Sequence, residues 1–293
     1  MNFMKKIKVR VPGTTANLGP GFDCLGMALT IYNTFTFEEN FQWKFINFEE
    51  KYANDMNLIV RSMRKVYEKA NKQLHPFTIS IDEQVPISRG LGSSATCIIG
   101  GIVAANHFLN YCFNEQEMIK IATEIEGHPD NIAPAFFGSL VSSVNGEEII
   151  TVKHDIDESL RFIVAIPDFS LSTKEAREVI PSKISYADAI YNMSRAINIP
   201  KALENGDLEM LLSLMKDKMH QPFRFPLIKD ADVFMRFAEE KRIPFCLSGS
   251  GSTLLMITKT NLIPELQKLV VTANWRFLEL KQDIKGTTLE VLS

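Results

Sequence analysis

The chain has 293 residues, of which 45% are hydrophobic and 23% are charged, and its formal net charge is −3. This length is enough for one large core or two domains, and the charge gives no electrostatic basis for binding nucleic acid or an anionic membrane. No apolar run reaches the roughly 18 residues that a membrane span needs, and the start lacks a signal-peptide core, so we expect a cytoplasmic protein with small-molecule partners. The four cysteines have no C-x-x-C spacing and are expected to be reduced, structural thiols.

The chain begins with alternating apolar and basic residues at 6–11, which predict a strand. Between Val11 and Gly26 lie four glycines and two prolines, so an irregular loop is expected between this strand and the next one at 30–37. Asn17 and Asp23 are the hydrogen-bonding side chains of this loop, and ordered loops of this length usually serve a function. A surface crossover with an Asx turn is the simpler alternative.

The strand-like pattern of this second strand covers 32–38, and a further strand-like run at 44–49 is followed by a helical pattern from about Asn57 to Asn71. Asn57 is placed to cap the start of this helix. A further strand is predicted at 77–82.

Residues 86–96 bring glycines and serines to the start of an apolar helix that is predicted from Ala95 to Phe108. Gly90 and Gly92 let the backbone approach an anion, and the first amides of a helix have no partner within it, so the segment is typical of a phosphate-binding loop. The hydroxyl of Ser94 is placed to contact a phosphate oxygen or Mg²⁺. A tight turn with a serine N-cap is the simpler interpretation of this stretch alone.

Two other nucleotide-binding patterns fit less well. Residues 90–95 match the loose dinucleotide fingerprint G-x-G-x-x-G/A, but the fingerprint needs a strand that runs straight into the turn. Here a connector containing Pro86 separates the strand from the glycines. No G-x-x-x-x-G-K-[ST] sequence occurs, which excludes a Walker A loop.

A helix is predicted from Glu115 to Glu126, with Asn114 and Glu117 as a capping box. It is followed, just before an apolar stretch, by three polar residues: His128, Asp130 and Asn131. Polar groups beside a core need partners, which makes this cluster a candidate site. A zinc site of the H-E-x-x-H kind needs a second histidine one turn away, so a structural histidine is favoured over a metal ligand.

The pattern changes after residue 152, and the remaining elements follow no regular alternation. Strands are expected at 162–166, 244–247, 254–257, 275–280 and 288–292, and helices at 174–179, 186–198, 207–219 and 231–241. The glycine-rich stretch 247–254 alone predicts a hairpin turn, and it is not the G-x-S-x-G nucleophile elbow because Ser250 lies directly between two glycines. The mixed order predicts an α+β fold with a boundary near residue 155.

Taken together, the glycine-rich and polar segments resemble the motifs of the GHMP kinase family. The stretch 11–26 is similar to the first motif of the family, 88–95 to its ATP loop, and 248–253 to its C-terminal glycine motif. Within the family, the stretches 16–23, 126–131, 173–177 and 221–224 resemble the homoserine kinases. The resemblance runs from about residue 5 to the last strands, and it departs at Ser250 and Ser252, where alanine and proline are common.

The resemblance implies a two-domain GHMP kinase fold of the α+β class. Residues 1–155 would form an N-terminal, ribosomal-S5-domain-2-like half that binds ATP, and residues 156–293 a C-terminal, ferredoxin-like half. It also implies an ATP-dependent and Mg²⁺-dependent kinase that phosphorylates the side-chain hydroxyl of L-homoserine to O-phospho-L-homoserine in threonine biosynthesis. Neither nucleic acid nor a membrane is expected as a partner, and a homodimer is left open.

The resemblance also assigns residues to ATP and the metal. The phosphates would be held by Pro86, Arg89, Gly90, Leu91, Gly92, Ser93, Ser94, Ala95 and Thr96. Gly249 and Ser250 would contribute from the C-terminal motif, and Asn57 would lie on the adenine side. Ser94 and Glu126 would hold Mg²⁺, although Glu124, half a turn earlier on the helix, is an alternative to Glu126.

The remaining motif residues are assigned to homoserine and to catalysis. The substrate-binding set is Asn17, Asp23, His128, Asp130, Asn131, Thr173, Arg177 and Arg224. Arginine pairs with a carboxylate through two hydrogen bonds, so Arg177 and Arg224 are the candidates for the α-carboxylate, although each would be a surface ion pair without the motif match. Asp23, Asn17 and His128 are the candidates for the ammonium and hydroxyl groups.

Asn131, Ser94, Glu126 and Arg177 form the predicted catalytic set. Homoserine kinases resemble mevalonate kinases but lack their catalytic Asp, and Asn131 stands in that region here. An amide cannot take a proton at neutral pH. We therefore expect Asn131 to orient the hydroxyl, while the proton leaves to the phosphate oxygens.

Two alternatives remain open from the sequence. A mevalonate-type kinase would be favoured if an Asp–Lys pair met at the phosphoryl site. A catalytically inactive ligand-binding relative would have lost the phosphate loop or the metal-binding acid, and intact Ser94 and Glu126 argue against it.

Overall fold

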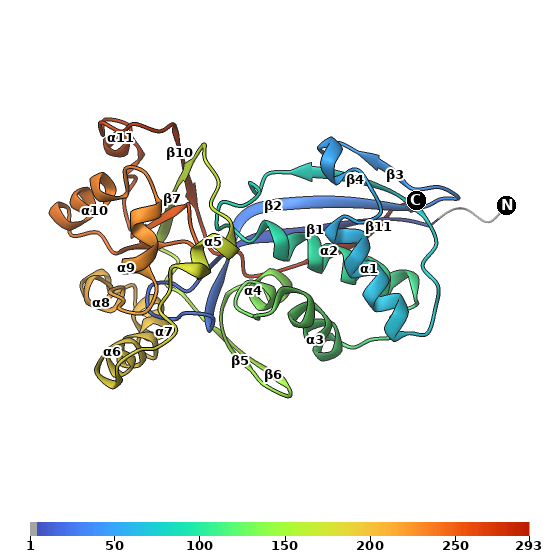
Figure 1. Cartoon of the computed structure of the whole chain (residues 1–293), viewed down its shortest axis with the longest axis horizontal. Coiled ribbons are helices and arrows are strands. Elements are labelled where there is room, and N and C mark those ends of the chain that lie inside the picture. Colours follow the sequence, from blue (N-terminus) through green and yellow to red (C-terminus); the bar gives the residue numbers. More distant parts are fainter. Residues whose placement is uncertain (1–4, 293) are drawn as a thin grey trace.

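Two β-sheets lie side by side in the computed structural model, which describes residues 5–292 (Figure 1). The first sheet has the order β11-β1-β2-β4-β3, and β5, which pairs with the start of β2, extends it together with β6. Its strands are β1 (Lys6–Ala16), β2 (Leu25–Glu39), β3 (Lys44–Ile46), β4 (Phe77–Glu83), β5 (Leu140–Asn145), β6 (Ile149–His154) and β11 (Thr288–Leu292). The second sheet has the order β10-β7-β9-β8. Its strands are β7 (Arg161–Pro167), β8 (Phe245–Leu247), β9 (Leu254–Thr258) and β10 (Trp275–Leu280).

Four helices cover one face of the first sheet, with α2 packed between α1, α3 and α4 (Figure 1). They are α1 (Leu58–Lys69), α2 (Ser93–Phe108), α3 (Glu115–Glu126) and α4 (Ile132–Phe137), and the short 3₁₀ helix η1 (Glu50–Tyr52) precedes them. Ile98, Ile99 and Ile102 of α2 are buried against Phe35 and Phe37 of β2 in one hydrophobic cluster. Because α2 is apolar on nearly all sides, it is held rigidly at the centre of this half.

The second sheet is covered on both faces. Along β7, Phe162 and Val164 belong to one buried cluster, whereas Ile163 and Ala165 belong to another, as expected for the alternation of side chains in a strand. The helices around this sheet are α5 (Thr173–Glu178), α6 (Tyr186–Ala196), α7 (Ile199–Glu204), α8 (Leu208–Leu214), α9 (Gln221–Arg224), the 3₁₀ helix η2 (Phe225–Leu227), α10 (Ala231–Glu240) and α11 (Ile263–Leu266).

The mixed order of helices and strands confirms the predicted α+β class, and most predicted elements are present. The helix predicted at 115–126 has these bounds in α3, and the capping box of Asn114 and Glu117 is formed. The helix predicted at 207–219 is shorter, because α8 ends at Leu214. In the described part of the chain, no helix is both long and apolar enough to cross a bilayer.

One expectation is wrong. The irregular loop predicted from Val11 to Gly26 is largely strand, since β1 continues to Ala16 and pairs with the start of β2. A shift of register between Pro12 and Gly13 allows the strand to pass the proline, which has no amide hydrogen to donate. Only residues 17–24 remain as a loop.

The division of the chain at residue 155 separates most of the two sheets, because β1 to β6 lie in the first and β7 to β10 in the second. The last strand departs from it, since β11 returns to the first sheet and pairs with β1. One buried cluster also joins Met27 and Leu29 of β2 to Phe162 and Val164 of β7. The two-domain boundary therefore stays a prediction.

Candidate active site

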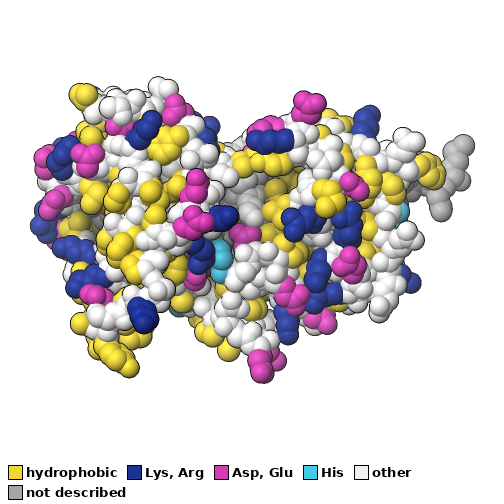
Figure 2. All heavy atoms as spheres, viewed as in Figure 1, with side chains coloured by type: hydrophobic (Ala, Val, Ile, Leu, Met, Phe, Trp, Pro, Cys, Tyr) yellow, Lys and Arg dark blue, Asp and Glu magenta, His cyan; other side chains and the backbone are white. Residues whose placement is uncertain are grey.

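A cavity of about 270 Å³ lies between the two halves of the molecule. Figure 2 shows the surface hollowed there, with a histidine and several charged side chains at its edge. The cavity is lined by residues of all four predicted motifs, which brings together Asn17, Gly90, Glu126 and Gly249 from distant parts of the sequence.

The phosphate loop meets this cavity at the first turn of α2. Gly92 is the N-cap of the helix in a left-handed conformation, with φ of 70°, and no side chain caps the first turn. The simpler interpretation, a serine N-cap, is therefore wrong. A Cβ on Gly90 would lie 2.2 Å from the carbonyl oxygen of Ser248, and one on Gly92 would lie 2.0 Å from Oγ1 of Thr14, so both positions require glycine. The uncapped amides at the helix start are available to an anion.

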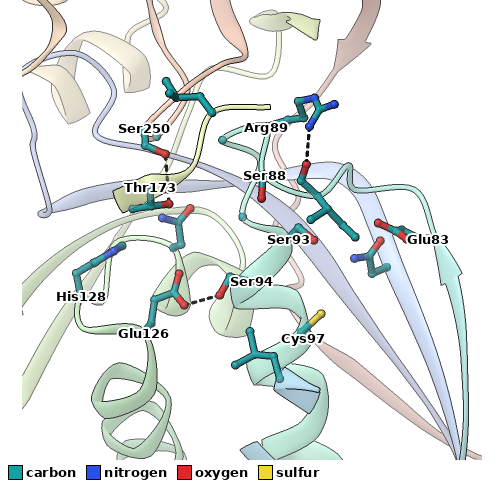
Figure 3. A pocket seen from close by; sticks show the side chains of 18 of the residues that line it. Glu83, Ser88, Arg89, Ser93, Ser94, Cys97, Glu126, His128, Thr173 and Ser250 are labelled. Carbon is teal, nitrogen blue, oxygen red and sulfur yellow. Dashed lines mark hydrogen bonds between the residues drawn. The ribbon is translucent and has the colours of Figure 1, made fainter. Parts of the chain in front are cut away.

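Ser94 and Glu126 meet at the end of the cavity nearest α2. The Oγ of Ser94 donates a hydrogen bond of 2.7 Å to Oε2 of Glu126, which is the last residue of α3 (Figure 3). Glu124 points elsewhere, because its carboxylate forms an ion pair of 3.0 Å with Lys69 of α1 and does not line the cavity. The structure thus places Glu126, and not Glu124, at the cavity, while the acid that holds Mg²⁺ stays a prediction.

Burial raises the pKa of Glu126 above its ordinary value of 4.5, and the nearby charge of Asp130 adds to this. The hydrogen bond from Ser94 and the positive charges of His128 and Arg177 act in the opposite direction without cancelling the shift. A partly buried carboxylate with a raised pKa gains from a cation placed beside it.

The loop of residues 17–24 is held in an unusual backbone conformation. Asn17, Leu18 and Asp23 have φ values of 69°, 45° and 57°, a region that residues other than glycine seldom occupy. The Asn17 side chain closes the loop and ties it to the C-terminal glycine motif: its Oδ1 accepts from the Asp23 amide at 3.0 Å, and its Nδ2 donates to the carbonyl of Gly249 at 2.8 Å. Such strain persists only where the surrounding structure enforces it, as it does at many binding sites.

His128, Asp130 and Asn131 form a connected polar group next to Glu126. Nδ1 of His128 lies within hydrogen-bond distance of Oδ1 of Asp130, which also accepts a 3.3 Å bond from Nδ2 of Asn131. The Oδ1 of Asn131 accepts a 2.7 Å bond from the hydroxyl of Thr14. Burial lowers the pKa of His128, but the hydrogen bond and charge of Asp130 outweigh it, so the pKa is raised overall.

Arg177 and Asp23 form an ion pair across the mouth of the cavity. The Nη1 and Nη2 atoms of Arg177 donate to the two carboxylate oxygens of Asp23 at 3.0 and 2.8 Å. The carboxylate of Asp23 also lies near His128 and Asp130, with one ligand atom of each of the three within 4.8 Å of the others. Positive and negative groups therefore alternate over a few ångströms on this wall.

Arg224 lies deeper and is only 1% exposed. Its Nε donates to the carbonyl of Ala176 at 2.9 Å, and its Nη1 lies 3.2 Å from Nδ1 of His220. No carboxylate of the described chain lies within salt-bridge distance of this guanidinium, although it lines the cavity. Burial and the charge of Arg177 lower the pKa of Arg224 to about 10, so it remains a cation at neutral pH.

His220 fixes the position of this arginine. Its Nε2 lies 2.7 Å from the carbonyl oxygen of Gly19, so Nε2 carries the hydrogen and donates. The Nδ1 lone pair of neutral His220 then accepts from Arg224. Asp217 accepts from the backbone amides of His220 and Gln221 at 2.9 and 2.6 Å, which anchors the start of α9.

The other end of the cavity is largely apolar, and its residues were not found from the sequence. It is lined by Phe48, Tyr52, Leu58, Ile59, Ile81 and Cys97, and Glu49 and Glu83 also line the cavity from the same segments. These side chains come from η1, α1, β4 and α2 and the segments beside them, and no single stretch of sequence shows that they meet. Asn57, predicted for the adenine side, lies at this end and caps α1 through a 2.9 Å bond from the Val60 amide.

Some predicted nucleotide-binding residues do not reach the cavity. Pro86, Leu91, Ala95 and Thr96 do not line it, and Leu91 and Ala95 are fully buried in the core. Arg89 lines it, but its guanidinium donates to the carbonyls of Pro167, Ile87 and Asp168 at 3.1, 2.9 and 2.7 Å. These contacts attach the phosphate loop to the end of β7.

The remaining predicted site residues lie at the rim of the cavity or in its wall. Thr173, at the start of α5, has its hydroxyl 3.5 Å from Oγ of Ser250 (Figure 3). The hairpin that was predicted around Ser250 is present, since β8 and β9 pair in an antiparallel manner. The cysteines Cys24, Cys97, Cys112 and Cys246 are all free, and burial raises the pKa of Cys97 to about 12, so it stays a neutral thiol.

Comparison with known proteins agrees with the motifs. The family model described as GHMP kinases N terminal domain matches residues 57–139. The homoserine kinase of Clostridium botulinum is 41% identical over 293 residues, which cover 97% of this chain and 98% of that protein. The homoserine kinase of Clostridium acetobutylicum is 40% identical, over 97% of this chain and 99% of that protein.

The fold also agrees with the resemblance to GHMP kinases. The crystal structure of homoserine kinase from Cytophaga hutchinsonii matches with a TM-score of 0.84 and 20% identity, over 99% of both chains. This similarity confirms the predicted GHMP kinase fold. Because relatives at about 40% identity extend over nearly its whole length, the chain belongs to the homoserine kinase family of the GHMP kinases.

Proposed function

We propose that this protein transfers the terminal phosphoryl group of ATP to the side-chain hydroxyl of L-homoserine, which yields O-phospho-L-homoserine for threonine biosynthesis. The observation that carries the proposal is the buried cation Arg224, which faces the cavity without a carboxylate of the described chain beside it. A buried charge is costly unless it is paired, so a ligand that brings a carboxylate is the natural partner.

An α-amino acid fits this wall because it carries one charge of each sign on adjacent groups. Its carboxylate would lie between Arg224 and Arg177, and its ammonium would lie against Asp23. The Arg177–Asp23 pair already has the alternating charges that a zwitterion requires. Asn17 supports this arrangement, since it fixes the backbone of Asp23.

ATP would bind with its phosphates at the first turn of α2 and its base in the apolar end near Tyr52 and Ile59. The uncapped amides and the positive end of the helix dipole favour the phosphates. The two ends belong to one cavity, so the reacting groups of both substrates meet near Ser94 and Asn131. Positioning of this kind is the main contribution that proteins make to phosphoryl transfer.

The Ser94 and Glu126 side chains fit an Mg²⁺ ion by the chemistry of their donor atoms, because a hydroxyl and a carboxylate are oxygen ligands that this ion prefers. Bound Mg²⁺ would neutralise charge on the transferring phosphoryl group. Glu126 would hold the ion in its ionised form, and Ser94 would hold it through a lone pair of its hydroxyl oxygen.

Asn131 is placed to orient the attacking hydroxyl. Its Oδ1 is fixed by Thr14, and its Nδ2 faces Asp130, so the amide holds one orientation. An amide does not accept a proton at neutral pH, so in this mechanism the hydroxyl proton passes to a phosphate oxygen. The His128–Asp130 pair is the competing base in the same wall.

The two alternatives from the sequence find less support. A mevalonate-type mechanism needs a lysine beside the catalytic aspartate, and the cations among the described residues that line the cavity are arginine and histidine. An inactive relative would lack the phosphate loop or the metal-binding acid, whereas the residues predicted for these roles, Ser94 and Glu126, are present and in contact.

Consumption of ATP by the purified protein, measured with homoserine, serine, threonine, mevalonate and galactose, tests the proposal. Homoserine should be phosphorylated with the highest kcat/KM, and chelation of Mg²⁺ should abolish turnover. Preference for mevalonate or galactose would overturn the amino-acid assignment. A cytoplasmic location remains a prediction.

A further inference from the structure

Phe22 lies against both of the arginines that face the cavity. The centre of its ring is 5.2 Å from the guanidinium carbon of Arg224 and 5.4 Å from that of Arg177. At distances below about 6 Å, the face of an aromatic ring attracts a cation. Unlike its neighbour Asp23, Phe22 is not among the described residues that line the cavity. Its ring therefore contacts the two cations without facing the cavity itself.

The imidazole of His220 is stacked on this ring. The two ring centres are 5.1 Å apart, and the planes are inclined by 27°. The side chain of His220 is fully buried, and it too is absent from the described wall of the cavity. Through Nδ1 it accepts a hydrogen bond from Arg224. Phe22 and His220 are therefore in contact with each other and with the guanidinium that lines the cavity.

The hydrogen bonds of Arg224 leave one nitrogen of its guanidinium free. Nε donates to the carbonyl of Ala176, and Nη1 donates to His220 and, at 3.4 Å, to the carbonyl of Gly249. Among residues 5–292, Nη2 has no hydrogen-bond partner. The guanidinium group has five N–H donors, of which Nη2 carries two. Because Arg224 lines the cavity, Nη2 is the nitrogen that is available to a carboxylate.

The two arginines would not stay together without support. Burial and the positive charge of Arg177 lower the pKa of Arg224, which shows that the two like charges repel each other. A long side chain that is free to move also loses conformational entropy when a ligand orders it, which weakens binding. The ring of Phe22 attracts both cations, and His220 accepts from one of them. These contacts order the cations before a ligand arrives.

We propose that Phe22 and His220 are positioning residues for the amino-acid substrate. They hold the guanidinium of Arg224 beside Arg177 with Nη2 free for the α-carboxylate, and they thereby set the affinity for homoserine without touching it. This inference rests on the proposed function, because the two residues act through the proposed carboxylate site. It requires a neutral His220 with its hydrogen on Nε2, since a hydrogen on Nδ1 would point at the hydrogens of Nη1.

The surroundings of His220 favour this neutral form. Burial is the main cause that lowers its pKa below the ordinary value of 6.5, and the charge of Arg224 adds to this. Asp217, whose Oδ2 is 3.6 Å from Nε2, the hydrogen bond to Gly19 and the charge of Asp23 act in the opposite direction without cancelling the shift. The carbonyl of Gly19 can only accept, so it keeps the hydrogen on Nε2.

The first test compares kcat and the KM for each substrate in two variants of His220. His220→Phe keeps a ring that can stack on Phe22 but removes the acceptor, so the KM for homoserine should rise roughly 10-fold or more. The kcat and the KM for ATP should change far less. His220→Gln keeps a neutral acceptor and should restore most of the affinity. A normal KM for homoserine in His220→Phe, or equal rises in the two variants, would overturn the role of His220.

The second test removes the aromatic ring. Phe22→Leu should raise the KM for homoserine roughly five-fold, again with far smaller changes in kcat and in the KM for ATP. Phe225→Leu is the matched control, because Phe225 directly follows Arg224, is partly buried like Phe22, and stacks on Phe245 with ring centres 5.7 Å apart. The cation–π contacts of Arg177 and Arg224 are with Phe22 instead. Equal effects of the two substitutions would overturn the proposal.

A measurement without substrate separates this inference from the proposed function. Nitrogen NMR of the imidazoles should show His220 neutral at neutral pH with its hydrogen on Nε2. Arg224→Met should raise the pKa of His220, because it removes a neighbouring cation. A hydrogen on Nδ1, or a pKa of His220 that does not respond to Arg224→Met, would overturn the proposal. Failure of the wild-type protein to phosphorylate homoserine would instead contradict the proposed function, and the NMR result would still decide whether His220 accepts from Arg224.

Discussion

Asp23 and Arg177 are 154 residues apart in sequence and form a two-bonded ion pair at the mouth of the cavity. Both side chains are more than 30% exposed, at 33% and 39%, so solvent screens the pair and its contribution to folding stability is small. We therefore expect substitutions here to change substrate binding more than stability.

The first prediction concerns the α-carboxylate of homoserine. Arg177→Ala should raise the KM for homoserine by roughly 30-fold or more and the KM for ATP far less. Bound homoserine would exclude solvent from Arg177, and loss of one partner of a desolvated charge pair costs about 2–5 kcal/mol. Arg224→Ala should also raise the KM for homoserine. The binding free energy lost in the double variant should be less than the sum of the losses in the two single variants, since both arginines would hold the same carboxylate. Steady-state kinetics with each substrate varied in turn will measure these effects.

An amino alcohol that lacks the carboxylate provides the control for this prediction. It should be a poor substrate of the wild-type protein and should lose little more in the arginine variants. Normal binding of homoserine by both single variants in calorimetry would contradict the amino-acid assignment and would favour a carbohydrate or isoprenoid alcohol.

The second prediction concerns Ser94 and Glu126, the pair that we propose to hold Mg²⁺. Ser94→Ala and Glu126→Gln should each lower kcat by roughly 100-fold or more, the scale of a lost transition-state contact, with a smaller change in homoserine affinity. Glu124→Gln is the matched control, because Glu124 lies on the same helix but pairs with Lys69 outside the cavity. Near-normal turnover in both site variants would remove them from the mechanism.

The third prediction concerns pH and stability without Mg²⁺. A carboxyl whose pKa is raised on folding binds its proton more tightly in the folded state, so the free energy of unfolding falls as pH rises from the ordinary value of 4.5 through the raised one. Glutamine does not titrate, so the Glu126→Gln variant lacks this fall in the free energy of unfolding. The Tm of the variant minus the Tm of the wild-type protein should therefore increase as pH rises above 4.5. Calorimetric melting curves of both proteins at several pH values will measure this Tm difference. A Tm difference that does not change with pH would contradict the prediction.

The fourth prediction separates direct transfer from base catalysis. If no side chain abstracts the proton, Asn131→Ala should reduce activity, whereas Asp130→Asn and His128→Ala should leave measurable turnover without a new limb in the pH–rate profile. Loss of chemistry in Asp130→Asn, with both substrates still bound, would identify the His128–Asp130 pair as the base.

The sequence predicted the elements whose signals are local. The bounds of α3 and its capping box follow from residues 114–127, and the phosphate loop follows from glycines that tolerate a positive φ. The length of β1 could not be predicted in this way, because its pairing with β2 compensates for Pro12 through a shift of register. Local propensity does not include this long-range pairing.

The sequence motifs supplied many of the residues that line the cavity. They did not show which of these residues contact one another. The preference of Glu126 over Glu124 depends on where α3 points relative to α2, which the sequence does not show. The apolar end of the cavity, with Phe48 and Ile81, has no sequence signal, since a partly buried phenylalanine or a buried isoleucine is typical of any core. Arg89 is the opposite case. The motif predicts that it contacts the phosphates, but its guanidinium donates to three backbone carbonyls.

The pairing of β11 with β1 has a consequence for synthesis of the protein. During translation, β1 emerges from the ribosome long before β11, since residues 288–292 pair with residues 6–10. The nascent chain therefore keeps this side of β1 unpaired until β11 has emerged, and such an edge is open to association with other chains. A chain that stops before residue 288 would keep this edge exposed throughout its lifetime.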